Sequence, residues 1–149
     1  GPEPLEKDFT FEKFKERLTG PPSPKATARR GKIKQILMKP EIIAGIGNIY
    51  SSEALWKAEI HPERDVSKLN IKELEELYEA IKKVLMLGIK LGGESFSDYR
   101  NVEGKKGEFD TERKVYQRED EKCSRCGAKI KRIKIGQRSA FFCPACQKL

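Results

Sequence analysis

Four cysteines, arranged as two Cys-x2-Cys pairs, constrain the fold of this 149-residue chain more than any other feature. The pairs are Cys123/Cys126 and Cys143/Cys146, and 16 residues separate them. Zinc takes four thiolates at tetrahedral corners, and a spacer of two residues lets both sulfurs of a pair reach one ion. The spacing therefore predicts one structural Zn2+, because four cysteines leave no coordination position for water. Two disulfide bonds are the alternative, which the lack of any sign of secretion disfavours.

The residues between the cysteine pairs predict a β-hairpin, with Lys129–Ile135 as one arm, a turn at 136–137, and 139–142 as the other arm. Burial alone cannot stabilise so small a unit, so metal removal should unfold it. Arg138 lies at or just past the tip, where a guanidinium can make a two-pronged contact with a phosphate. An arginine exposed to solvent without a ligand is the alternative. Before the first pair, Lys114–Arg118 predicts a short strand.

The excess positive charge is concentrated at the C-terminal end of the chain. Residues 113–149 hold 11 Lys/Arg against 3 Asp/Glu, whereas residues 1–112 hold 20 of each. A compact basic segment indicates a polyanionic partner, with nucleic acid ahead of membrane, although a basic surface kept for solubility would look the same. No run of about 18 uncharged apolar residues occurs, so we expect no membrane span. The first four residues lack the features of a signal peptide.

Apolar residues at helical spacing predict two short helices near the N-terminus. The first follows Thr10 as its cap, and the glycine and prolines of 20–24 end it. Its inner face carries Phe11, Phe14 and Leu18. The second spans 26–38 and ends before Pro40. Its expected inner residues are Ile33, Ile36 and Leu37, and its expected outer residues are Arg29, Arg30, Lys32 and Lys34.

The clearest helix begins after Asn70, which can act as its N-cap. Glu73 completes a capping box, and Leu69 with Leu74 forms a hydrophobic staple. Apolar residues keep helical spacing up to the glycine pair at 92–93, where the helix should end. They are Leu74, Leu77, Tyr78, Ile81, Val84, Leu85 and Ile89. We assign this helix to packing.

A Gly-x-Gly turn precedes a further predicted helix, which spans 48–58. Gly45 and Gly47 expose backbone N–H groups without Cβ obstruction, and the N-terminal end of the helix carries a partial positive charge. Together they predict a seat for a phosphate, to which Asn48 can add a side-chain amide donor. A tight turn between helices, without a ligand, is the alternative.

The run from Ala44 to Arg64 carries a resemblance to a known family. It is Ala-Gly-Ile-Gly-Asn-Ile-Tyr-Ser-Ser-Glu-Ala-Leu-Trp-Lys-Ala-Glu-Ile-His-Pro-Glu-Arg. This run resembles the helix–two-turns–helix motif of bacterial formamidopyrimidine-DNA glycosylases, which belong to the Fpg/Nei family of base-excision repair enzymes. The Asn-Ile-Tyr and Glu-Ala-Leu-Trp pieces favour that branch over the endonuclease VIII branch. The resemblance extends over nearly the whole chain, but only to the C-terminal half of the family.

The resemblance implies a mainly α fold class, a helix–two-turns–helix bundle followed by a small β-hairpin zinc ribbon. The implied domains are a DNA-binding domain over 1–93, a flexible lesion-recognition loop over 94–112 and the zinc ribbon over 113–149. For 94–112, an ordinary mobile linker between the two domains is the alternative. The implied DNA contacts are Gly45, Gly47, Asn48, Tyr50 and Arg138. Ala140 stands where a threonine is more usual, which puts one minor contact in doubt. Glu53 matches a family glutamate that faces the active-site side, so the resemblance implies a supporting role in catalysis in a complete enzyme. The alternative is an exposed glutamate near a helix start.

The family uses an N-terminal proline as its amine nucleophile, a glutamate directly after it, and a β-sandwich domain. Pro2 and Glu3 imitate that start, but Gly1–Leu5 also matches the segment between the family's domains. We therefore expect no catalytic residue in this chain, which should bind DNA without cutting it. His61, the only histidine, is expected to be structural.

The predicted function is the DNA-binding portion of a glycosylase/AP lyase that acts on oxidised purines. Its partner would be damaged or abasic double-stranded DNA, bound by a monomer in the bacterial cytoplasm. A non-catalytic protein that binds damaged DNA on its own is one alternative, and an RNA-associated zinc-ribbon protein is another. The central expectation is that Asn48 and Arg138 lie side by side, because both should contact the same DNA strand.

Overall fold

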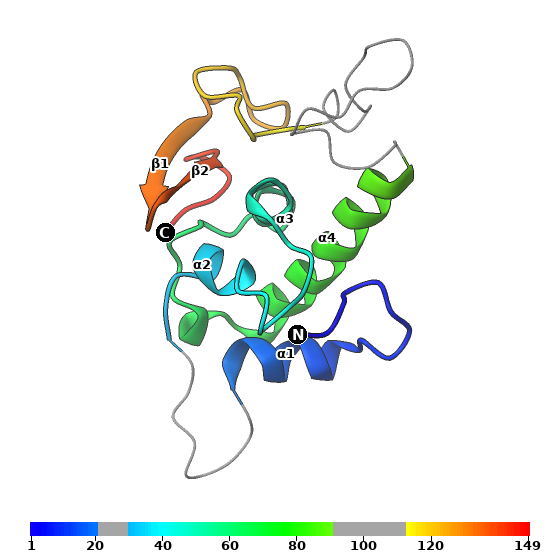
Figure 1. Ribbon diagram of the computed structural model, residues 1–149. Coiled ribbons are helices and arrows are strands. Elements are labelled where there is room, and N and C mark those ends of the chain that lie inside the picture. Colours follow the sequence, from blue (N-terminus) through cyan, green and yellow to red (C-terminus); the bar gives the residue numbers. More distant parts are fainter. Residues whose placement is uncertain (21–29, 91–112) are drawn as a thin grey trace.

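A computed structural model of the chain describes residues 1–20, 30–90 and 113–149. Within these ranges, four α-helices and one short 3-10 helix precede a two-stranded antiparallel sheet (Figure 1). The elements are α1 (Phe11–Thr19), α2 (Ile33–Leu37), α3 (Asn48–Lys57), η1 (Val66–Lys68), α4 (Ile71–Lys90), β1 (Lys131–Ile135) and β2 (Arg138–Phe142). The predicted order of helices followed by a β-hairpin is confirmed. The predicted loop at 94–112 and the glycines at 92–93 lie outside the described residues.

The helical core forms around α4, against which α1 and α3 both pack. The predicted capping box is present, since the Glu73 N–H donates to Asn70 Oδ1 at 2.8 Å and the Asn70 N–H to Glu73 Oε1 at 3.0 Å. Apolar side chains of α1, α2, α3 and α4 share one cluster, whose largest fully buried members include Phe14, Leu18, Ile33, Leu37, Leu55, Leu74 and Leu77. None of the helices in the described ranges is both long and apolar enough to cross a membrane.

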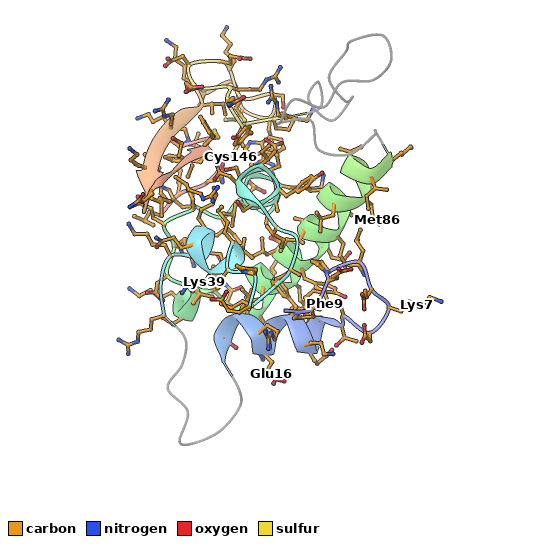
Figure 2. All side chains as sticks on the ribbon, in the orientation of Figure 1. Lys7, Phe9, Glu16, Lys39, Met86 and Cys146 are labelled. Carbon is orange, nitrogen blue, oxygen red and sulfur yellow. The ribbon has the colours of Figure 1, made fainter. Side chains whose placement is uncertain are left out.

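One side of the last turns of α4 is exposed, although Gly88 in the same turns is buried. Ile89 is on the predicted apolar stripe but is 67% exposed, and Figure 2 shows Met86 pointing away from the other helices.

The second helix is shorter than predicted within the described residues, outside which the predicted residues 26–29 lie. In the described residues α2 begins only at Ile33, because Gly31 has a φ of +126° and Lys32 pairs with Asp65 in an isolated bridge. The prediction that Lys34 faces outward is wrong, since this side chain is 2% exposed. It lies against the start of α3, where its amine finds partners that compensate for burial.

The hairpin matches the prediction closely. β1 and β2 pair in the register Lys131↔Phe142 to Ile135↔Arg138, and Gly136 takes the φ of +63° that the turn requires. The strand predicted at Lys114–Arg118 is wrong, because this segment consists of bends and turns. Its first three backbone N–H groups bind a side chain of α3 and so cannot pair with a neighbouring strand.

Candidate nucleic-acid interface and zinc site

The glycine turn before α3 has open space beside both of its glycines. Gly45 has a φ of +81°, a conformation that favours glycine, and Gly47 is the N-cap of α3 without a side-chain hydrogen bond to the helix. A Cβ atom added at either glycine would meet no described atom within 4 Å. The first turn of α3 contains no acidic residue. This geometry suits an anion, because the positive end of the helix and its unsatisfied N–H groups are accessible.

A groove of about 430 Å³ joins the tip of α3 to the hairpin. Its lining residues are Asn48, Tyr116, Gln117, Glu119, Arg132, Arg138, Ser139 and Phe141. Asn48 comes from the first turn of α3 and Arg138 from the start of β2, so the two predicted contacts share one concave surface. Sequence reasoning did not find Gln117 and Arg132, because nothing in their local pattern distinguishes them from other exposed polar residues.

Lys34 lies against the start of α3 and fixes the side chain of Asn48. Its Nζ donates to Asn48 Oδ1 and lies 3.4 Å from the Asn48 carbonyl oxygen. Because Lys34 takes the amide oxygen, the two N–H donors of the Asn48 amide are left to face a ligand. Burial, and after it the positive charge of Arg138, lower the pKa of Lys34 to about 7. This role could not be predicted from the chain, because Lys34 stands among basic residues that helical spacing assigns to the outer face.

Tyr50, predicted to contact DNA, is buried between α3 and α4. A Cβ atom at Gly88 of α4 would collide with its hydroxyl group, so the close approach of the two helices depends on that glycine. This position gives the ring a packing role, and a contact between Tyr50 and DNA stays a prediction.

Glu53 connects α3 to the segment that leads into the cysteine-rich region. Its carboxylate accepts hydrogen bonds from the backbone N–H groups of Lys114 at 2.7 Å, and of Val115 and Tyr116 at 2.9 Å. Burial raises the pKa of Glu53, and the three backbone donors oppose that rise. The alternative of an exposed glutamate is wrong, because the side chain is 4% exposed. A supporting role in catalysis stays a prediction.

The sulfur atoms of the four cysteines form one cluster and lie within 4.8 Å of one another. Two of the separations are 4.0 Å, between Cys123 and Cys146, and 3.4 Å, between Cys126 and Cys143. Four thiolates about 2.3 Å from one zinc ion would stand about 3.8 Å apart, so the cluster fits tetrahedral zinc. The cysteines are not joined in disulfide bonds.

Side chains outside the cluster hold it against α3. The Trp56 indole N–H donates to Cys123 Sγ at 3.4 Å, and Arg125 Nε donates to Cys146 Sγ at 3.2 Å. The Arg125 guanidinium also lies 3.8 Å over the Trp56 ring and donates to the Trp56 carbonyl at 2.8 Å. Figure 2 shows Cys146 beside α3. Such partners orient metal ligands and offset their negative charge.

A buried glutamine adds a further connection between the cysteine-rich region and the helices. The Gln147 side chain donates to the carbonyl of Ile60 at 3.0 Å and accepts from the N–H of Cys143 at 2.8 Å. One side chain thus spans both parts of the protein.

His61 and Pro2 are both engaged in packing. His61 Nδ1 accepts from the Glu63 N–H at 3.0 Å, its ring centroid is 4.5 Å from that of Phe142, and burial lowers its pKa. The carbonyl of Pro2 accepts from the N–H of Ala44 at 3.0 Å. The Pro2 segment therefore lies against the loop that leads into the glycine turn.

Known protein families match both the helical part of the chain and its cysteine-rich part. Residues 1–100 match the formamidopyrimidine-DNA glycosylase H2TH domain, and residues 120–149 match the zinc finger found in FPG and IleRS. Together with the cysteine cluster, the second match confirms the prediction of one structural zinc site.

Two curated relatives are formamidopyrimidine-DNA glycosylases of Herpetosiphon aurantiacus and Heliobacterium modesticaldum. They are 47% and 44% identical to this chain, each over 99% of it, and the matched regions are 51% and 50% of those proteins. The chain thus spans about half the length of the curated relatives it matches.

Solved structures agree with this relationship. The Lactococcus lactis Fpg in complex with DNA containing an abasic site is 40% identical, with a TM-score of 0.85 over 100% of this chain and 52% of that protein. MutM in complex with DNA containing carbocyclic 8-oxo-G is 39% identical, with a TM-score of 0.83 over 100% of this chain and 51% of that protein. Since the H2TH model alone covers well over half of the residues, this chain belongs to the formamidopyrimidine-DNA glycosylase H2TH domain family.

Proposed function

We propose that this chain is the DNA-binding portion of a base-excision repair glycosylase/AP lyase, and that it grips duplex DNA beside a damaged or abasic nucleotide. The observation that carries the proposal is the groove shared by Asn48 and Arg138. A helix N-terminus and an arginine, separated by 90 residues in the chain, meet on one surface. Each is suited to a phosphate oxygen, and phosphate contacts fix the register of a protein on DNA.

The geometry already described supports the proposed contacts. The N–H groups after Gly45 and Gly47, the Asn48 amide and the Arg138 guanidinium are the phosphate donors. Residues 113–149 carry more basic than acidic side chains. Basic side chains attract DNA and release the counterions bound to its phosphates, which favours binding. Several of the similar solved structures hold abasic or oxidised-purine DNA, which supports the same class of partner here.

Catalysis belongs, in this proposal, to the half of the relatives that the chain does not cover. The complete protein would excise oxidised purines and cut the abasic strand, and the 149 residues would bind without cutting. We further propose a helix–two-turns–helix domain over 1–93, a lesion-recognition loop over 94–112 and a zinc ribbon over 113–149. A chromosomal DNA partner implies a cytoplasmic location at the nucleoid of a bacterium.

Binding of fluorescent duplexes, followed by anisotropy over a range of salt concentrations, tests the proposal. The zinc-loaded chain should prefer a duplex with a tetrahydrofuran abasic analogue over an undamaged duplex and over structured RNA. Arg138→Ala should weaken binding about tenfold and lower the salt slope by about 0.9, because it removes one charged phosphate contact. Lys131→Ala is the matched control, since Lys131 is exposed on the same hairpin but does not line the groove. Preference for RNA, or equal effects of both variants, would contradict the proposal.

A further inference from the structure

We infer that Arg132 is a second phosphate-binding arginine of this groove, and that Glu119 competes with DNA for it. The inference rests on the proposed function, because it names a further contact on the same surface. Arg132 lies on β1 and Arg138 on the neighbouring strand β2, and both residues line the groove with Asn48.

An ion pair holds Arg132 within the groove. Its Nη1 lies 3.4 Å from Glu119 Oε2, and the two side chains are 58% and 36% exposed. Among the described residues that line the groove, Glu119 is the only acidic one. A negative charge at this place opposes an incoming phosphate, whereas the arginine beside it favours one.

The exposed pair is weak enough to be exchanged for a stronger partner. One long contact between solvated side chains contributes little to stability. A phosphate can instead accept two parallel hydrogen bonds from a guanidinium, which is the stronger arrangement. The arrival of a DNA strand would therefore move Arg132 from the Glu119 carboxylate to a phosphate, and Glu119 would remain as a solvated side chain at the rim.

In this inference Glu119 lowers the affinity for DNA by occupying Arg132, so substitutions at the two positions should not have independent effects on binding. Glu119→Gln keeps the size of the side chain but frees the guanidinium, so affinity for the abasic duplex should rise about threefold to fivefold. Arg132→Ala should weaken binding about fivefold and lower the salt slope by about 0.9. In the Arg132→Ala background, Glu119→Gln should have only a small effect, because its target is gone.

A matched control separates this pairing from the general effect of removing a negative charge. Asp120 is exposed, lies next to Glu119 in the chain and does not line the groove. Asp120→Asn removes the same charge, so it should raise affinity less than Glu119→Gln and by the same factor whether or not Arg132 is present. Zinc content and circular dichroism of every variant establish that it is folded, and Arg132→Gln replaces Arg132→Ala if the latter loses its zinc.

The experiment is a double-mutant cycle, measured by anisotropy on the abasic duplex with Arg138→Ala alongside. Loss of the Glu119→Gln gain in the Arg132 variant supports the inference. Additive effects of the two substitutions, or equal effects of Glu119→Gln and Asp120→Asn, would overturn it. One outcome would contradict only this inference: the unmodified chain binds the duplex, Arg138→Ala weakens that binding, and the effects of Glu119→Gln and Arg132→Ala on affinity are additive. If the unmodified chain does not bind the duplex, the proposed function fails.

Discussion

At the scale of single residues, Lys34 shows that a fold can bury a basic side chain that helical spacing in the sequence assigns to solvent. Its neighbours in α2 follow the expected apolar face, yet its own amine is buried under Asn48. Helical spacing alone could not predict this, because the burial depends on α3, which approaches from a distant part of the sequence. The three donors that bind Glu53 come from an even more distant segment, so the role of that residue was equally hidden.

The buried amine predicts a pH-dependent stability that Lys34→Met should remove. The folded-state pKa of Lys34, about 7, lies below the ordinary lysine value of 10.5, so the unfolded chain binds more protons between these two values. The free-energy cost of burying the charged Lys34 amine therefore acts in full below pH 7 and disappears as the pH rises towards 10.5. Between pH 7 and 9.5 the free energy of unfolding of the unmodified chain should rise by up to about 3 kcal/mol more than that of Lys34→Met. Urea denaturation measures this, and parallel pH profiles would contradict the assignment.

At the scale of elements, α3 connects the groove, the segment at 114–116 and the cysteine cluster. Its first turn faces the groove, its middle holds Glu53, and its last turn holds Trp56 against the cysteine cluster. Helix α3 and the capping of α4 could be predicted, because periodicity and caps are local signals. The limits of α2 and the turns at 114–118 could not, because pairing with Asp65 and with Glu53 decides them.

The two glycines before α3 should separate stability from binding. Gly45→Ala strains a backbone with a φ of +81° and should destabilise the protein by about 1 kcal/mol. Gly47 has a φ of −96°, which alanine adopts freely, so Gly47→Ala should leave stability nearly unchanged. Its new methyl group would stand in the open space before the helix and should weaken binding of the abasic duplex at least tenfold. Thermal melts and anisotropy on both variants test this, and unchanged DNA affinity in Gly47→Ala would contradict a phosphate seat there.

Arg125 should control how tightly the ribbon keeps its metal. Zinc with four thiolates has a net charge of about −2, which the guanidinium offsets while it donates to Cys146. Arg125→Ala should lower zinc affinity about tenfold in a chelator competition. Lys129→Ala is the control, since Lys129 is an exposed cation of the same ribbon. Trp56, the only tryptophan, should change its fluorescence as zinc leaves. Equal zinc affinities of the two variants would count against this role.

At the scale of the whole molecule, two hydrophobic clusters meet at the C-terminal end of α3. Trp56 belongs to the cluster of the cysteine-rich region, and Tyr116 packs against both clusters. The cysteine spacing predicted a zinc ribbon but could not predict its position, because docking depends on Arg125, Gln147 and Glu53, whose contacts span the sequence. The shared groove is a consequence of this docking, so the metal should control DNA binding without touching DNA.

Removal of zinc should therefore unfold residues 113–149 and abolish binding to the abasic duplex. The helices should survive, because their core cluster is formed by α1–α4 and the segments between them. Circular dichroism with anisotropy, before and after chelation and again after zinc is restored, measures both effects. Undiminished DNA affinity in the zinc-free protein would contradict the dependence of the groove on the ribbon.

The most direct test of the shared groove is an NMR titration of the zinc-loaded chain with an abasic duplex. The account predicts that the Asn48 side-chain amide, the backbone N–H groups of 47–49 and the Arg138 Nε–H shift with one common midpoint, while signals of α1 stay in place. A titration in which either Asn48 or Arg138 remains unperturbed at saturation would contradict the claim that helix tip and hairpin grip the same strand.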